Sequence, residues 1–138
     1  MNVSLIKWYL FFWIKMKENS LEIKTYIQIA RKKYKEGNIH QANEIYRKLI
    51  NKKIYTYDLL ISYGQFNKDI NNLNIAKNLF ILSIKKYPLK INSYILLAEI
   101  LRKENKIEDA LKALYEAKKF YLTWNYQMIA SYFFRKKF

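Results

Sequence analysis

The chain has no cysteine, a single proline, a single histidine and only two glycines among its 138 residues. Without cysteine there is no disulfide framework and no thiolate metal site, and nothing in the composition argues for an oxidising compartment. The two glycines, Gly37 and Gly64, lie too far apart to form a glycine-rich phosphate loop. These absences exclude disulfide-stabilised and nucleotide-loop classes and favour a cytoplasmic protein.

The sequence also lacks a set of side chains that could act together in catalysis. An enzyme would need a nucleophile with its base, paired carboxylates or clustered metal ligands. The only histidine, His40, stands at the start of a predicted helix and suits a surface or capping role. Glu104, Glu108 and Asp109 straddle a predicted turn, where the helix dipole favours acidic side chains. We therefore expect a protein that is not an enzyme and has no metal and no cofactor.

The chain has few acidic residues. It contains 11 Asp and Glu and 26 Lys and Arg, which gives a formal net charge of +15. Clustered cations can bind nucleic acid by releasing counterions from phosphates. Only four of them are arginine, however, and the arginine fork is the side chain that reads phosphates and guanine edges best. The chain is also rich in Ile, Asn, Tyr, Phe and Lys, whose codons are AT-rich. We therefore treat nucleic acid as an unlikely partner.

The chain does contain an internal repeat with a period of 34 residues. Small residues recur at this spacing, and a large apolar residue follows each of them four positions later. The first column is Ala42, Ala76 and Ala110, and the second is Tyr46, Phe80 and Leu114. Three further columns are Ala30, Gly64 and Ala98, then Ile39, Leu73 and Ile107, then Leu49, Ser83 and Ala117. Such columns are typical of stacked helical hairpins, in which small residues let two helices approach and each hairpin covers the next.

The pattern predicts two helices in each repeat. The expected helices span 21–36 and 39–51, 56–69 and 72–87, and 91–104 and 107–120. Gly37-Asn38, Asn71-Asn72 and Asn105-Lys106 stand where a helix ends and a residue that tolerates positive φ is needed. Pro88, the only proline, falls between the second and third hairpins, outside any helix interior.

The two ends of the chain do not follow the full repeat. Residues 125–138 repeat only the first-helix pattern, through Tyr126, Ile129, Ala130 and Phe133, and we expect a capping helix there. Residues 1–20 form an apolar segment that is too short for a bilayer span of about 20 apolar residues and lacks the features of a secretory signal. Three interpretations of this segment stay open: a helix packed on the first repeat, a surface for self-association as a homodimer, and an anchor at a membrane surface.

Residues 21–138 resemble the tetratricopeptide repeat family. The second helices begin near IHQANEIYRKL, LNIAKNLFILS and IEDALKALYEA, and Tyr26, Leu60 and Tyr94 stand where the family often has tryptophan. The resemblance implies an all-α solenoid of three hairpins, about 23–56, 57–90 and 91–124, with a C-terminal capping helix and an extra N-terminal apolar helix. We also expect Tyr26, Tyr46 and Tyr94 to be core residues. The stretch YIQIARKKYKEGNIHQANEIYRKLI looks like the first repeat of the small bacterial chaperones for type III secretion translocators.

Members of the repeat family generally act as adapters, scaffolds or chaperones that hold a peptide of a partner protein in a concave groove lined by the first helices. The resemblance therefore implies a groove of mixed apolar and basic character. The residues expected to line it are Ile27, Arg31, Tyr34, Lys35, Ile61, Gln65, Lys68, Ile95, Glu99, Arg102 and Lys103.

Overall fold

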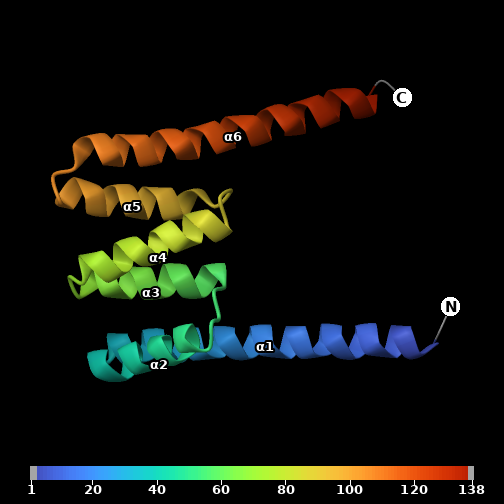
Figure 1. Ribbon diagram of the computed structural model, residues 1–138, viewed down its shortest axis with the longest axis horizontal. Helices are drawn as coiled ribbons and strands as arrows, with labels where there is room; N and C mark the ends of the chain where they lie inside the picture. The colour runs from blue at the N-terminus through green and yellow to red at the C-terminus, as the bar shows by residue number, and fades with distance from the viewer. Residues whose placement is uncertain (1–2, 137–138) are drawn as a thin grey trace. The chain divides into compact units, whose positions relative to one another are not determined.

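The computed structural model describes residues 3–136 of the chain, and the side chains of residues 3–15 and 19–122. Over the described range the chain is all-α and contains no strand. The helices are α1 (Val3–Lys35), α2 (Ile39–Asn51), α3 (Tyr57–Asp69), α4 (Leu73–Lys86), α5 (Ile91–Lys103) and α6 (Ile107–Lys136) (Figure 1). They divide into two compact units, Met1–Ser62 and Tyr63–Phe138, whose boundary lies within α3.

The hairpin turns confirm the predicted turn residues. Gly37, Asn71 and Asn105 all have positive φ, at 85°, 65° and 61°. In each turn the N–H of the next residue donates to the carbonyl oxygen five positions back, at an N···O distance of 2.8 to 2.9 Å. This bond closes the last turn of the first helix, so the second helix starts in the antiparallel direction. Two of the second helices begin at the predicted residues, Ile39 and Ile107, and α4 begins at Leu73, one residue after its predicted start.

The predicted N-terminal and capping segments are helical over their described residues, 3–20 and 125–136, but neither forms a separate helix. No break occurs near residue 20, and α1 is continuous over its 33 residues. No break occurs near residue 124 either, and α6 is continuous over its 30 residues. The physical reason is the same at both places: the sequence contains no glycine or proline there to end a helix. The side chains of Tyr126, Ile129, Ala130 and Phe133 lie outside the described residues.

In the first unit, α1 and α2 lie side by side, and α1 extends well beyond the end of α2 (Figure 1). The packed half of α1 contributes Ala30, which is fully buried. From α2 come Ala42, Tyr46 and Leu49, which are 0%, 1% and 5% exposed. These residues belong to the predicted columns, which therefore mark the contact between the two helices correctly.

In the second unit, α4 packs on α5 and α5 packs on α6. Gly64 of α3 and Phe80 of α4 make a close contact, because a Cβ on Gly64 would lie 2.9 Å from both Cδ1 and Cζ of Phe80. Between α4 and α5, the buried hydroxyl groups of Ser83 and Ser93 share a hydrogen bond of 2.8 Å. The buried side-chain amide of Asn67 donates to the Tyr63 carbonyl oxygen one turn earlier in α3, at 2.8 Å.

Two predicted core residues are exposed instead. Tyr26 is 42% exposed, whereas Tyr94 is buried, donates to the Pro88 carbonyl oxygen and contacts the Phe120 ring. In the first repeat the position of Phe120 is held by Lys52, so Tyr26 has no aromatic ring to pack against. The position of the Pro88 turn is also helical there, because α1 is continuous, so Tyr26 has no turn carbonyl to which its hydroxyl could donate. Leu114 is 42% exposed because no further hairpin packs on α6 among the described residues of this unit.

Candidate functional site

An ion pair in the second unit brings together two residues predicted to line the groove. Lys68 of α3 approaches Glu99 of α5, with 2.8 Å between Nζ and Oε2. The two side chains are 18% and 44% exposed, so water reaches the carboxylate more easily than the ammonium group. The pair therefore holds the acidic side chain of Glu99 in place on α5 and leaves part of it open.

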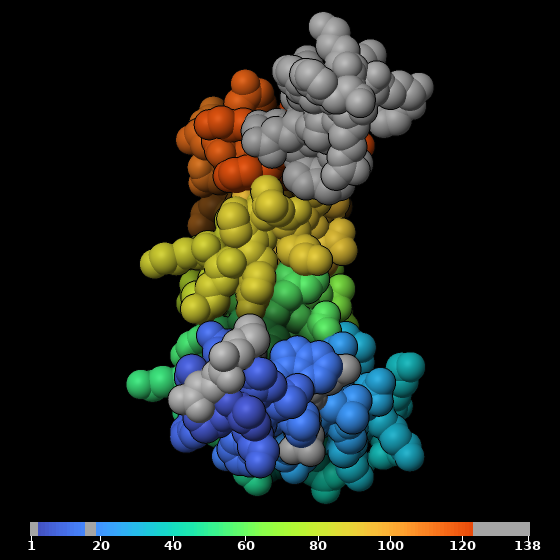
Figure 2. All heavy atoms as spheres, turned by 90° about the vertical axis from the view of Figure 1, so that its right-hand side faces the viewer, coloured from blue at the N-terminus to red at the C-terminus, as the bar shows by residue number. Residues whose placement is uncertain are grey.

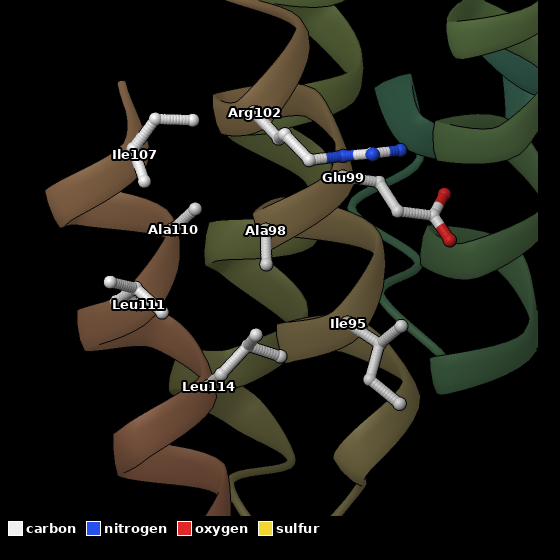
Figure 3. A pocket seen from close by; sticks show the side chains of 8 residues that line it. All are labelled: Ile95, Ala98, Glu99, Arg102, Ile107, Ala110, Leu111 and Leu114. Atoms are coloured by element: carbon white, nitrogen blue, oxygen red, sulfur yellow. The ribbon is translucent and has the colours of Figure 1, made fainter. Parts of the chain in front are cut away.

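Three predicted groove residues of α5 lie on one face of the helix and line a pocket. Ile95, Glu99 and Arg102 follow one another at intervals of four and three, which places them above each other on an α-helix. The pocket measures about 280 Å³ and its other wall is apolar (Figure 3). Ala98 of α5 also lines the pocket, and the apolar wall is made by four residues of α6: Ile107, Ala110, Leu111 and Leu114.

Figure 3 shows the side chains of Glu99 and Arg102 extending from α5 away from α6. Ile95 is 41% exposed, so an apolar side chain is offered beside these charges. Gln65 lies one turn before Lys68 on α3, and Lys103 follows Arg102; both side chains are exposed. We call this set the α5 surface: Gln65, Lys68, Ile95, Glu99, Arg102 and Lys103.

A second ionic cluster of this unit is structural. The Glu104 carboxylate accepts hydrogen bonds from Lys77 at 2.9 and 3.0 Å and pairs with Lys106 at 3.0 Å. The hydrogen bonds from Lys77 and Lys106 hold the pKa of Glu104 below its usual range. The cluster links α4 to the end of α5, and this agrees with the structural role expected for the acidic residues at this turn.

In the first unit, some of the predicted groove residues make contacts that stabilise the fold and do not offer their side chains to a ligand. Arg31 donates a hydrogen bond to the Ser62 hydroxyl and lies beside the buried Tyr46. Burial raises the pKa of Tyr46, and the charge of Arg31 opposes that rise. Ile27 is 2% exposed and is therefore a core residue that does not offer its side chain to a ligand. Of the others, Tyr34 and Ile61 are half-buried and Lys35 is exposed.

The first half of α1 exposes an apolar segment on all its sides. We call residues 3–14 the α1 arm; Figure 2 looks onto the end of the molecule where it lies. The exposed fraction of Trp8, Tyr9, Phe11, Phe12 and Trp13 is 60% or more in every case. The interpretation that this segment packs on the first repeat is therefore wrong. A helix that is apolar on all sides cannot be covered by a single repeat at its far end, because α2 packs only beside the second half of α1.

Sequence reasoning missed the apolar wall that α6 contributes to the pocket. Leu111 is 61% exposed, and the equivalent positions of the two earlier repeats hold Asn43 and Lys77. That change from polar to apolar at one position of the repeat is the signal that could have found it. Among the described residues no group of three or more His, Cys, Asp or Glu side chains could hold a metal ion. None of the described helices is both long and apolar enough to cross a bilayer.

The fold is similar to several solved structures. The type III secretion chaperone SycD of Yersinia enterocolitica, in complex with a peptide of the translocator YopD, superposes with a TM-score of 0.64 over 74% of this chain and 76% of SycD, at 16% identity. A point mutant of MamA gives a TM-score of 0.61 over 72% of each chain, at 12% identity. An O-GlcNAc transferase mutant of Thermobaculum terrenum gives 0.61 over 73% of this chain, but only 19% of the transferase, at 15% identity.

These neighbours share a tetratricopeptide-type architecture. The chain has a tetratricopeptide-repeat fold. The predicted fold class is thereby confirmed, with the first and last helices longer than the pattern of this repeat implies. No protein-family model and no curated protein sequence matches the chain. The repeat residues alone carry the assignment at the level of sequence.

Proposed function

We propose that this tetratricopeptide-repeat protein is a non-enzymatic, cytoplasmic adapter or chaperone that holds a peptide segment of a partner protein on the α5 surface. The observation that carries the proposal is the arrangement of Ile95, Glu99 and Arg102 along one side of a pocket whose other wall is apolar. Partly exposed apolar side chains beside fixed charges are the usual composition of a peptide-binding surface.

The charges of the α5 surface favour a particular kind of peptide. Lys68, Arg102 and Lys103 are basic and Glu99 is the one acidic member, already paired with Lys68. An apolar residue of the peptide would contact Ile95 and supply most of the affinity by removing apolar surface from water. Acidic residues beside it would pair with Arg102 and Lys103 and fix its direction.

A more specific form of the proposal is a chaperone for type III secretion translocators. It is supported by the similarity of the fold to SycD, which has been solved with a peptide of its translocator YopD. It is also supported by the first-repeat stretch between Tyr26 and Ile50, which resembles that class. In this form the partner is a translocator protein, and the peptide is the segment that the chaperone protects before secretion.

The test is affinity capture from the native lysate with nuclease treatment and a salt series, followed by direct titration of the protein that is recovered. Ile95→Asp places a charge at the apolar centre of the α5 surface and should weaken binding at least tenfold, whereas Ile81→Asp should not. Ile81 is 48% exposed on α4, close to the 41% of Ile95, and lies outside the α5 surface. The proposal is overturned if Ile95→Asp binds the partner as wild type does while circular dichroism shows it folded.

A second candidate function is favoured by the exposure of the α1 arm: assembly at a membrane surface. Aromatic and aliphatic side chains cover all sides of the arm, Lys7 and Lys15 accompany them, and residues 1–17 contain no acidic residue. Such a segment suits the interface of an anionic bilayer, where Trp and Tyr rings settle at headgroup level. Deleting residues 1–17 should abolish flotation with anionic vesicles, and a truncated protein that still floats would refute this function.

A further inference from the structure

The pocket between α5 and α6 has a counterpart one repeat earlier. Each residue that lines the pocket lies 34 positions after a residue of α3 or α4. Phe80 of α4 is fully buried, whereas Leu114, which holds the same position in α6, is 42% exposed. The helix that packs on α4 from the following repeat is α5. The pocket is therefore the place that a helix equivalent to α5 would cover.

The described part of the chain leaves this pocket open. The segment Ile107–Lys136 is one unbroken helix, so none of its residues turns back over the pocket. Leu111 on the apolar wall is 61% exposed, whereas the side chain of its counterpart Lys77 is only 20% exposed. Covering the wall with a helix from another protein would remove its apolar side chains from water, which is favourable.

Two ion pairs show how α5 is held by the helices before it. Lys68 of α3 approaches Glu99 with 2.8 Å between Nζ and Oε2, and Lys77 of α4 approaches Glu104 with 2.9 Å between Nζ and Oε1. Glu99 and Glu104 are five residues apart, which corresponds to ~7.5 Å along a helix axis at ~1.5 Å per residue. A helix that binds as α5 does therefore makes two contacts at this fixed interval.

We propose that the client segment binds in the pocket as an α-helix that runs antiparallel to α6, as α5 runs antiparallel to α4 (Figure 1). Its register follows from the residues that replace the two lysines. Arg102 holds the position of Lys68, and Leu111 holds the position of Lys77. The bound helix therefore carries an acidic residue at Arg102 and, five positions later, an apolar residue at Leu111. This inference rests on the proposed function, because it specifies the peptide that the α5 surface holds.

Charge and side-chain freedom both support an acidic residue at Arg102. The side chain of Arg102 is exposed and lines the pocket. In Figure 3 it extends away from α6, and rotation about its own torsions brings the guanidinium group over a bound helix. Glu99, one turn earlier, is already paired with Lys68. A carboxylate of the client can therefore form with Arg102 the ion pair that Glu99 forms with Lys68.

The spacing of the two contacts distinguishes a helix from an extended peptide. An extended chain rises ~3.3 Å per residue, so it covers ~7 Å in about two residues. An extended client would need its acidic and apolar residues two positions apart, whereas a helical client needs them five positions apart. The five-residue interval is the one that α5 uses in this fold, and a helix also satisfies its own backbone hydrogen bonds against an apolar wall.

The probe is a fluorescein-labelled peptide with the sequence of residues 90–104, made in two forms. One form keeps Glu104, and the other has Glu104→Leu, which places an apolar residue five positions after Glu99. Fluorescence anisotropy with the full chain titrated into each peptide gives the two dissociation constants. Wild type should bind the leucine form at least tenfold more tightly than the glutamate form.

A change in the protein should reverse this preference. Leu111→Lys restores the lysine that pairs with Glu104 in the preceding repeat, and Lys77 shows that the fold accepts lysine at this position. The variant should therefore bind the glutamate form more tightly than the leucine form. Ile81→Lys is the matched control, because Ile81 is 48% exposed on α4 and lies outside the pocket, and it should keep the wild-type preference.

A proline tests the helical form on the wild-type protein. Leu97→Pro in the leucine form of the peptide disrupts the helix and should weaken binding at least tenfold. The proposal is overturned if neither form binds saturably, if the proline peptide binds as its parent does, or if a folded Leu111→Lys keeps the wild-type preference. These measurements use no native client. If Ile95→Asp releases the captured client while the peptides give any of these results, the peptide-binding function stands and only its helical form is wrong.

Discussion

Replacing Gly64 by alanine is a direct test of how closely α3 and α4 approach. Alanine should stabilise the interior of α3 by ~1 kcal/mol relative to glycine, because it has the higher helix propensity. The new methyl group, however, would lie 2.9 Å from two ring carbons of Phe80, whose side chain is fully buried and cannot move into solvent. Overpacking of this kind costs ~1–3 kcal/mol. We therefore expect Gly64→Ala to lower the free energy of unfolding by up to ~2 kcal/mol, since strain outweighs propensity.

A double-mutant cycle with Phe80→Leu isolates the two effects. Leucine is smaller than phenylalanine and should make room for the methyl group, so Gly64→Ala should stabilise the Phe80→Leu background while it destabilises the wild type. Urea unfolding followed by circular dichroism gives the four free energies, and the coupling between the two sites should exceed ~1 kcal/mol. If Gly64→Ala raised the stability of the wild type by the full propensity term, the close contact would be refuted.

Three further changes have clear expected outcomes. Lys53 has a φ of 57°, which L-residues with long side chains disfavour, so Lys53→Asn should raise the thermal midpoint, and an unchanged or lower midpoint would contradict this. Ser83→Ala leaves the buried Ser93 hydroxyl without its partner and should cost ~1–3 kcal/mol in urea unfolding, whereas the double change to alanine should cost less. Hydrogen bonding from Lys77 lowers the pKa of Glu104, so the stability from this group is present above pH 4.5 and is lost as the pH falls below it; unfolding titrations of Lys77→Met should show a smaller loss, because Lys106 still pairs with Glu104.

The sequence predicted the hairpins well because their residues act locally. A left-handed residue at Gly37, Asn71 or Asn105 ends one helix wherever it stands, and a small residue such as Ala42 or Ala76 is needed wherever two helices touch. The ends of the chain could not be predicted in this way. Whether a capping segment turns back depends on a break in the helix, and the repeat pattern is equally compatible with a straight continuation.

The candidate site was predictable only in part. Helical spacing put Ile95, Glu99 and Arg102 on one face, and the structure places them along one pocket. The same spacing gave no warning that Ile27 is buried, because burial depends on the helix that packs against the position. Leu111 could not be found from the repeat columns, because they contain only positions at which similar residues recur. At this position the two earlier repeats have polar residues, Asn43 and Lys77, and only the third has an apolar one.

The hairpin turns have a consequence for synthesis on the ribosome. Each turn joins two helices whose contacts lie within about one repeat of sequence, so little of the chain must be present before those contacts can form. Folding that depends on local contacts is fast, and domains commonly acquire structure from the N-terminus as the chain emerges. The pair of α1 and α2 can therefore assemble while α5 and α6 are still being translated, and the exposed apolar side chains of α6, such as Leu111, leave the ribosome only after α1 to α4 have emerged.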